Sequence, residues 1–325
     1  MGAKGHTVEI IADPGVLGAT VVKIMRVHNS AVLPRAMMLG EFLDLKLPPR
    51  VTMLAPIFAE KSINMIFAPR GIGKTYLALS IAYAMGTGGS LLRWQADRAR
   101  RILIIDGEMP AAALQDRLRE IADGQGNRSY ADANIGVLAA DLFEAGLPDL
   151  STAEGQEALA PHLDGYDLII ADNISTLART GRENESESWG RLQEWSLTQR
   201  RAGRSVLWLH HAGKGGEQRG TSKREDVMDT VIKLSHPTDY SPTEGARFIV
   251  EFTKARGFMG EGAEAFEAQL TNGVWTHKSA SDAREARILA LHAEGNSQRD
   301  IATEVGCSAA TVNRAIKRST LGGVA

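Results

Sequence analysis

Residues 68–76 combine the residue types that bind phosphate. Gly71, Gly73, Lys74 and Thr75 come directly after an apolar run and before residues with helical periodicity. Glycines let the backbone approach an anion, and a helix that begins here points its positive end at the same oxygens. Lysine suits the β and γ phosphates, and a threonine hydroxyl suits Mg²⁺. The pattern predicts a Walker A loop that binds ATP and Mg²⁺.

This loop departs from the usual pattern at one position, because Ala68 stands where the first glycine is expected. The alternative interpretation is a glycine-rich turn between a strand and a helix that binds no ligand. Lys74 is also expected to act in catalysis, and Thr75 is expected to bind the metal. The residues expected to contact the nucleotide are consecutive in the chain: Ala68, Pro69, Arg70, Gly71, Ile72, Gly73, Lys74, Thr75 and Tyr76.

Acidic residues follow two apolar runs that are typical of strands buried on both faces. Asp106 and Glu108 come after Ile102–Ile105, and a later run ends at Asp172. Ligands bind at the carboxyl ends of strands in doubly wound sheets. We therefore expect Asp172 to hold Mg²⁺ together with Thr75, and Glu108 to polarise the water that attacks the γ-phosphate. The alternative is that these acids cap the segments that follow.

A histidine pair, His210 and His211, ends another apolar run, Ser205–Leu209. Adjacent residues of a strand point to opposite faces, so the pair is a poor metal chelate. We expect a histidine at this strand end to contact the γ-phosphate and to sense its loss, with packing in the core as the alternative.

Cationic residues gather in two later segments. Lys214, Arg219 and Lys223 lie in a glycine-rich stretch that suits contact with a phosphodiester chain, although an ordinary solvated loop has the same composition. Lys254 and Arg256 lie on the same side of an extended segment. Their placement suits entry into the nucleotide site of a neighbouring subunit, as arginine fingers do.

The chain after Asp282 predicts three short helices in helix-turn-helix order. The first covers Arg284–His292, the second is capped by Ser297, and the third is capped by Ser308 and runs through Arg318. The alternative is a small adaptor with a basic face. The expected core is Ile288, Leu291, Ile301, Ala302, Val305, Val312 and Ile316. The residues expected to bind duplex DNA are Thr311, Asn313, Arg314 and Lys317.

Net charge, cysteine content and the length of apolar runs exclude several classes of protein. The formal net charge is −2 over 325 residues, so contacts with nucleic acid must come from local basic patches. Cys307 is the single cysteine, which excludes an internal disulfide and a thiolate metal cluster. The sequence shows neither the pattern of a signal peptide nor an apolar run of the ~18 residues that a membrane helix needs. We expect a cytoplasmic protein.

The order of the strand and helix patterns predicts an α/β fold with a doubly wound, mainly parallel sheet and flanking helices, followed by a small all-α domain. We expect an N-terminal segment over 1–45 with no legible chemistry, an ATPase domain over 46–277, a linker over 278–282 and a helix-turn-helix domain over 283–320.

Two connecting segments carry predictions of their own. Gly124–Asn134 has the composition of a polar loop. Asn272-Gly273 lies between two strand-like runs and predicts the tight turn of a β-hairpin.

Taken together, these motifs give residues 40–277 a resemblance to RecA-like ATPases, in the group that includes RepA-type plasmid replicative helicases and their phage and mobile-element relatives. Its most specific parts are the Glu108 strand, the segment 210–215 and the Lys254/Arg256 pair.

The resemblance implies a role for each of these residues. It makes Glu108 the catalytic base, His210 the sensor and Asp172 the metal-associated acid. Lys254 and Arg256 become fingers that act on the site of a neighbouring subunit.

The resemblance also implies an assembly. It predicts a hexameric ring, with single-stranded DNA passing Arg179, Arg182 and the segment 214–223. The C-terminal segment resembles the helix-turn-helix of resolvases, which the RepA-type pattern lacks.

Three functions are compatible with these patterns. The first is a replicative helicase or translocase of a plasmid, phage or mobile element. The second is an ATP-gated, sequence-specific DNA-binding regulator, and the third is a RecA- or RadA-like recombination or repair ATPase.

Overall fold

The computed structural model describes residues 35–179, 185–212 and 226–322. The chain divides into two units, residues 1–49 and 50–325. The described part of the first unit holds one short helix, α1 (Leu39–Leu43). Arg182, Lys214, Arg219 and Lys223 lie outside the described residues.

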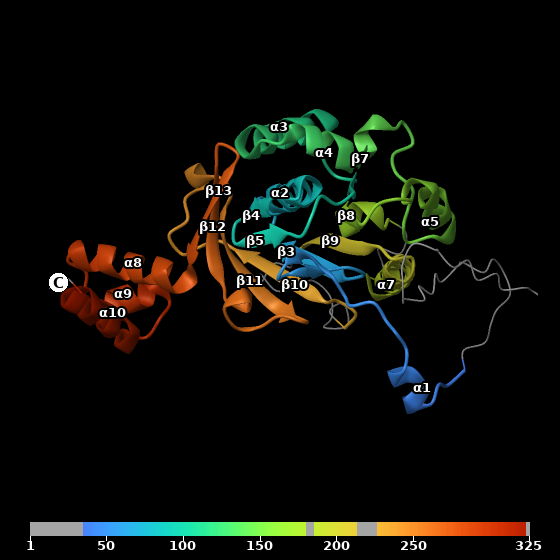
Figure 1. Cartoon of the computed structure of the whole chain (residues 1–325). Helices are drawn as coiled ribbons and strands as arrows, with labels where there is room; N and C mark the ends of the chain where they lie inside the picture. Colours follow the sequence, from blue (N-terminus) through green and yellow to red (C-terminus); the bar gives the residue numbers. More distant parts are fainter. Residues whose placement is uncertain (1–34, 180–184, 213–225, 323–325) are drawn as a thin grey trace, which may run out of the picture. The chain divides into compact units, whose positions relative to one another are not determined.

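A nine-stranded sheet forms the centre of the second unit (Figure 1). The six strands from β10 to β7 are parallel, and β11, β12 and β13 extend the sheet in antiparallel fashion. The doubly wound, mainly parallel fold predicted from the sequence is thus confirmed. In order across the sheet the strands are β13 (Val274–Ser279), β12 (Phe266–Thr271), β11 (Arg247–Ala255), β10 (Thr230–Ser235), β3 (Ile63–Ala68), β9 (Ser205–His211), β8 (Leu168–Asp172), β6 (Ile102–Asp106) and β7 (Ile135–Ala139).

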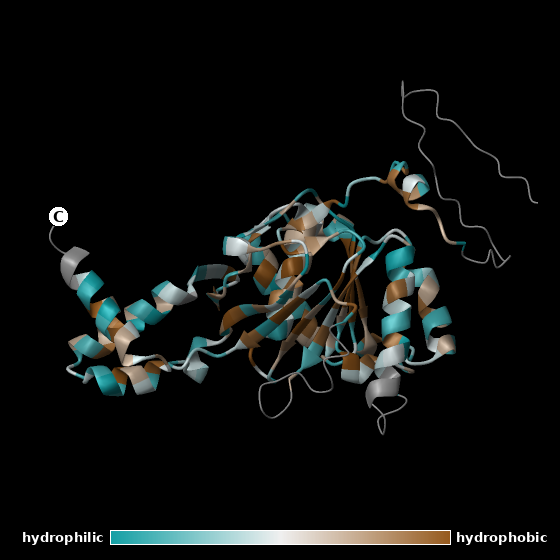
Figure 2. Cartoon of the chain, turned by 90° about the horizontal axis from the view of Figure 1, so that it is seen from below, coloured by the Kyte–Doolittle hydropathy of each residue, from teal (hydrophilic) through white to brown (hydrophobic). Residues whose placement is uncertain are grey.

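Helices cover both faces of this sheet, because alternate strand residues are apolar on both sides. On β6, Ile104 packs in the cluster around α2 (Lys74–Thr87), whereas Ile105 packs in the cluster around α7 (Glu185–Arg201). The apolar residues concentrate in the strands between these layers (Figure 2). The other helices are α3 (Ala111–Gln125) and α4 (Arg128–Asn134) near α2, and α5 (Ala153–Leu159) and α6 (Ile174–Leu177) on the α7 side.

A second, four-stranded sheet packs against the antiparallel end of the first. The Trp94 ring lies edge-on to Phe266 at 5.7 Å, and the Arg93 guanidinium lies over the same ring at 4.3 Å. In order its strands are β2 (Phe58–Ala59), β1 (Thr52–Ala55), β5 (Trp94–Ala96) and β4 (Ser90–Leu91). Short 3-10 turns connect elements elsewhere: η1 (Ala140–Leu142), η2 (Ala160–His162), η4 (Pro242–Glu244) and η5 (Gly260–Ala263).

The prediction of a polar loop over 124–134 is wrong. After α3 the chain forms α4 and then the edge strand β7, which the sequence analysis did not anticipate. Tertiary contacts explain the helix, because Ala131 is buried and Asn134 Nδ2 donates to the Gly86 carbonyl oxygen at 2.9 Å. These contacts are invisible in the polar composition of the segment.

The C-terminal residues form the three predicted helices, α8 (Ala280–Ala293), α9 (Gln298–Val305) and α10 (Ala309–Gly322). Their core contains the apolar residues expected from the sequence, together with Ala315. The Ser297 side chain caps α9 by accepting from the Asp300 N–H. Because β13 runs through Ser279, the segment 278–282 consists of a strand end and the first turn of α8.

Across the described ranges, every helix is too short or too polar to cross a membrane.

Candidate active site

The phosphate loop lies between β3 and α2, at the carboxyl edge of the parallel strands. Gly73 has a φ of +106°, and a Cβ added there would meet the Ala246 Cβ at 2.8 Å. Both the backbone conformation and the close approach therefore require glycine. The loop leaves Arg70 exposed, while Lys74 at the helix start is buried with 6% exposure.

Thr75 and Lys74 both face the end of β8. The Thr75 hydroxyl donates to Asp172 Oδ2 at 2.6 Å, and Lys74 Nζ lies 3.8 Å from Asp172 Oδ1. Asp172 is 3% exposed, and among the described residues its Oδ1 accepts no hydrogen bond. The sequence-based pairing of Thr75 with Asp172 thus corresponds to a direct contact.

These oxygens fit a magnesium ion. A hydroxyl and a carboxylate are hard ligands, and Mg²⁺ in phosphate sites is held by one or two such groups plus phosphate oxygens and water. The described residues contain no group of three or more His, Cys, Asp or Glu side chains able to hold a metal alone. Thr75 and Asp172 are therefore suited to a metal that arrives with a nucleotide.

Strand register brings Asp106 and His211 to the same edge. Asp106 lies directly beside Asp172 across the β6–β8 pair, and His211 lies beside Ala68 across the β9–β3 pair. The carboxyl ends of four neighbouring strands, β3, β9, β8 and β6, consequently converge beside the phosphate loop.

Glu108, Asn173 and His211 form a cluster at this edge. Asn173 Nδ2 donates to Glu108 Oε2 and lies 3.2 Å from His211 Nε2. His211 Nε2 lies 3.4 Å from Glu108 Oε2. The Glu108 side chain is 43% exposed, so one side of its carboxylate remains accessible to water.

The orientation of Asn173 is determined by its own surroundings. Its Oδ1 accepts from the Ser175 N–H at 2.9 Å, which caps α6. The amide nitrogen is then directed at Glu108 and His211. Asn173 therefore connects the end of β8 to the Glu108 carboxylate.

The surroundings of His211 favour its neutral form. Burial lowers the pKa of the imidazole, and the positive charges of Lys74 and Arg70 lower it further, against the opposing effect of Glu108. A neutral ring has one donor and one acceptor nitrogen. The tautomer therefore decides whether Nε2 donates to Glu108 or accepts from Asn173.

The structure brings His211, and not His210, to this cluster. His210 is 5% exposed. Alternation along β9 explains the difference, because Leu207 and Leu209 pack on the α2 side and His211 continues that face. The sequence analysis missed His211 and Asn173, although counting in steps of two from the apolar positions would have indicated His211.

Asp106 lies beneath the cluster. It is 1% exposed, and its Oδ1 accepts from the N–H groups of Glu108 and Met109 at 3.0 and 2.7 Å. Burial raises its pKa to about 6, helped by the nearby Asp172 and Glu108 charges and opposed by the two backbone hydrogen bonds. Asp106 thus positions the turn that carries Glu108.

Lys254 and Arg256 lie at the opposite end of the sheet. Ala246 and Phe248, at the start of β11, lie against the phosphate loop, whereas Lys254 and Arg256 follow roughly 25 Å farther along the strand. Arg256 Nη1 lies 3.8 Å from Asp229 Oδ1 and remains 52% exposed. Neither residue can reach the phosphate loop of its own chain.

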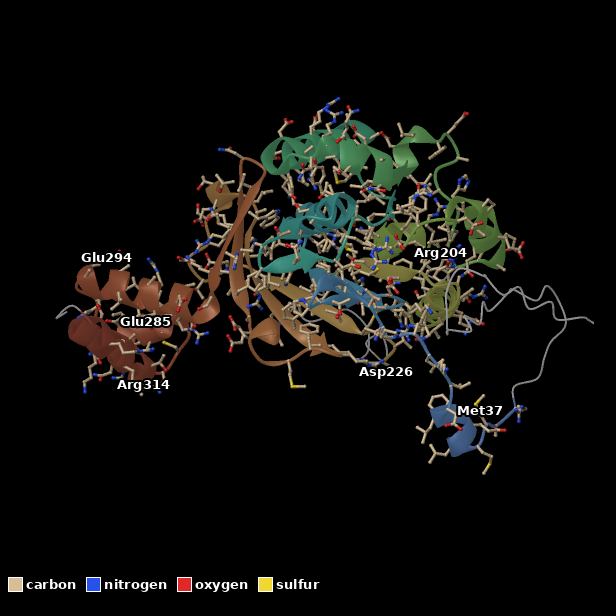
Figure 3. All side chains as sticks on the ribbon, viewed as in Figure 1. Met37, Arg204, Asp226, Glu285, Glu294 and Arg314 are labelled. Atoms are coloured by element: carbon tan, nitrogen blue, oxygen red, sulfur yellow. The ribbon has the colours of Figure 1, made fainter. Side chains whose placement is uncertain are left out.

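Some of the residues expected to contact DNA form hydrogen bonds within the chain, and others are exposed. Arg179 Nη2 donates to the Leu147 carbonyl oxygen at 2.6 Å. On α10, Arg314 and Lys317 are exposed (Arg314 in Figure 3), while Asn313 Nδ2 donates to Gln298 Oε1 at 3.2 Å. The Thr311 hydroxyl lies 2.9 Å from that of Ser308.

The parallel sheet, the phosphate loop and the strand-end acids define a RecA-like P-loop ATPase with a C-terminal helix-turn-helix. The chain belongs to the AAA domain family, whose model matches residues 32–217. Residues 279–325 match the homeodomain-like domain. The RecA-like class expected from the sequence is thus confirmed, and family membership implies a nucleotide site.

Two solved structures resemble this chain. A KaiC-like protein from the hyperthermophilic archaeon Pyrococcus horikoshii OT3 is 13% identical, with a TM-score of 0.51 over 71% of this chain and 99% of that chain. The RadB recombinase is 17% identical, with a TM-score of 0.48 over 67% of this chain and 91% of that chain. At 13% identity, the similarity to the KaiC-like protein concerns the fold alone.

Proposed function

We propose that the protein is an ATP-hydrolysing motor that acts on DNA, as a replicative helicase or translocase of a plasmid, phage or mobile element. The observation that carries hydrolysis is the Glu108–Asn173–His211 cluster beside the Thr75–Asp172 pair. The helix-turn-helix supports DNA as the partner.

Different residues of the chain bind the phosphates, hold the metal and accept the proton. Lys74 and the backbone N–H groups of the loop bind the phosphates. Thr75 and Asp172 would hold Mg²⁺, which when bound neutralises charge on the phosphate oxygens. Glu108 accepts the proton of the water whose oxygen attacks the γ-phosphorus, while the bond to the ADP oxygen breaks.

Asn173 and His211 act on Glu108 as positioning residues. Each contacts the same carboxylate oxygen, Oε2, which leaves Oε1 for the attacking water. Loss of the γ-phosphate would release hydrogen bonds at this cluster. We assign the sensor role to His211, in place of His210, because His211 makes these contacts.

A neighbouring copy completes the site. Because Lys254 and Arg256 lie far from their own phosphate loop, their proposed role is to stabilise phosphoryl charge in an adjacent subunit. We propose a hexameric ring, with single-stranded DNA contacting Arg179 and the residues outside the described ranges, Arg182, Lys214, Arg219 and Lys223.

The exposed basic face of α10 favours a second candidate, an ATP-gated DNA-binding regulator. In that case Thr311, Asn313, Arg314 and Lys317 would select a duplex site, and hydrolysis would switch assembly.

ATP turnover tests both candidates. It would be measured on the full chain alone, with single-stranded DNA and with duplex DNA, at two salt concentrations, with Lys74→Ala as the inactive control. Strong, salt-sensitive stimulation by single strands is expected for the motor. Duplex binding without stimulation would reject the motor in favour of the regulator, and turnover equal to that of Lys74→Ala would reject both.

A further inference from the structure

Three arginines surround one carboxylate at the amino edge of the sheet. Asp229 lies directly before β10, shortly after the labelled Asp226 of Figure 3, and it is 4% exposed. In the part of the chain that the structure describes, its carboxylate forms ion pairs with Arg50, Arg200 and Arg256. Within the same ranges, each of these arginines pairs with no other acid. The cluster therefore carries more positive than negative charge.

The two oxygens of the Asp229 carboxylate have different partners. Oδ2 accepts from the Ile63 N–H at 3.0 Å and from Arg200 Nη2, and these contacts join the start of β10 to β3 and α7. Oδ1 lies 3.2 Å from Arg50 Nη2 and 3.8 Å from Arg256 Nη1. Arg50 and Arg256 therefore compete for the same oxygen.

Arg256 is the more weakly held of these two arginines. Its side chain is 52% exposed, whereas Arg50 lies closer to Oδ1, and Arg50 Nε also donates to the Glu60 carbonyl oxygen at 3.0 Å. The backbone of Arg256 is fixed, because its N–H donates to the Asp229 carbonyl oxygen at 2.8 Å. The side chain can thus leave the carboxylate without moving the strand. Asp229 then keeps two cationic partners, which avoids the cost of an unpaired buried charge.

We propose that Arg50 is a positioning residue for the arginine finger. By occupying Asp229 Oδ1, Arg50 weakens the hold of this carboxylate on Arg256 and leaves the guanidinium available to the phosphate oxygens of a neighbouring subunit. Without Arg50, Asp229 would bind Arg256 more tightly, in competition with that phosphate. Arg50 touches no nucleotide in this role. The inference rests on the proposed shared nucleotide site.

ATP turnover of Arg50→Ala tests the inference. The Arg50 side chain is 44% exposed, and the phosphate loop is untouched, so the variant should fold and bind a fluorescent nucleotide as the wild type does. Its turnover number is expected to fall about tenfold. Arg50→Lys, which keeps the charge, should restore most of the turnover, and Arg98→Ala, at an exposed arginine elsewhere, is the control. Unchanged turnover in Arg50→Ala would overturn the inference.

A second substitution separates this role from a structural one. Asp229→Asn removes the charge that holds Arg256, so Arg50→Ala/Asp229→Asn should turn over ATP faster than Arg50→Ala alone. A structural role, or direct contact of Arg50 with phosphate, predicts no such recovery. Melting temperatures would show that the double variant is folded. Turnover in the folded double variant at or below that of Arg50→Ala would reject the competition for Asp229.

Mixing shows which side of the subunit interface is affected, and it uses Arg50→Ala alone. An equimolar mixture with Lys74→Ala should recover about one quarter of wild-type turnover, since one site in four then combines a sound loop with an available finger. A mixture with Arg256→Ala should not exceed the better of its components, because both lack an available finger. Recovery of Arg256→Ala but not of Arg50→Ala by Lys74→Ala would overturn this inference alone. Recovery of neither would also reject the shared site of the proposed function.

Discussion

Two side chains at the ends of different strands position the Glu108 carboxylate. Asn173 comes from the end of β8 and His211 from the end of β9, and both contact Oε2. Asp106 holds the turn from below through the Glu108 N–H. Both contacts thus fall on one carboxylate oxygen, and the Glu108 side chain is 43% exposed.

Replacing Glu108 with Gln should preserve ATP binding and lower the turnover number by about 10²–10⁴-fold, because general base catalysis contributes that much. Binding of a fluorescent nucleotide and release of phosphate would be measured in parallel. Glu144→Gln is the control, since Glu144 is an exposed carboxylate outside the cluster. Unchanged turnover in Glu108→Gln would reject its assignment as the base.

The two histidines should respond differently to substitution. His211→Gln is expected to lower turnover at least tenfold with little change in stability, because it disturbs the position of Glu108. His210→Gln is expected to lower the melting temperature more, because His210 is the more deeply buried of the two. Phosphate release and thermal unfolding would be recorded for both. A larger loss of turnover in the folded His210 variant would restore that residue as the sensor.

We expect Asp106 to make the free energy of unfolding depend on pH. Its pKa is about 6 in the folded chain and near 3.8 when unfolded. The folded state therefore binds more protons between pH 4 and 6, and the free energy of unfolding falls as pH rises through this window. The free energy of unfolding that Asp106 contributes at low pH, and that is lost once the pH has risen past 6, is at most about 3 kcal/mol.

Asp106→Asn should remove this dependence while keeping an oxygen for the two backbone N–H donors. Urea unfolding without nucleotide or Mg²⁺ would be followed from pH 4 to 7.5. The wild type should lose stability relative to the variant as pH rises. A difference between the two proteins that stays constant across the range would contradict the raised pKa.

At the scale of elements, β11 runs from the phosphate loop at one edge of the sheet to the cationic residues at the opposite edge. Its first residues contact the phosphate loop, and its last residues, Lys254 and Ala255, lie beside the beginning of β10. An antiparallel strand added to a parallel sheet produces this arrangement. One chain therefore presents a phosphate loop at one edge of the sheet and cations at the opposite edge.

Mixing experiments test this arrangement. Arg256→Ala and Lys74→Ala should each lose turnover, and an equimolar mixture should recover about one quarter of wild-type turnover, since one site in four then combines a sound loop with a sound finger. Arg98→Ala, which removes an exposed arginine elsewhere, is the control. The absence of recovery at any mixing ratio would argue against a shared site.

At the scale of the whole molecule, the chain carries a C-terminal helix-turn-helix after its P-loop domain. The C-terminal helices bury a core of their own, around Ile301 and Val312. This separate core predicts that substitutions on the exposed face of α10 leave the ATPase intact.

The double variant Arg314→Ala/Lys317→Ala should weaken duplex binding and reduce the slope of log K against log salt by about 2, because each phosphate contact contributes about 0.9. Turnover without DNA should be unchanged. Arg284→Ala on α8 is the control. Equal losses of DNA binding and DNA-free turnover would contradict the separation of the two functions.

Local signals were enough to predict much of the fold and part of the site. The glycine-rich loop ahead of Lys74, the apolar strands that end in acids and the Ser297 cap act over a few residues, where backbone preference dominates. The same is true of the hairpin turn, where Asn272 and Gly273 both have positive φ.

Tertiary structure decided what depends on distant residues. Strand order places His211 and Asn173 against Glu108, although they are 65 or more positions away in the sequence. Packing against α2 makes a helix of the polar segment 128–134. The sheet also separates Arg256 from its own phosphate loop. Each outcome follows from contacts between elements, because side chains that meet only after folding leave no pattern in neighbouring residues.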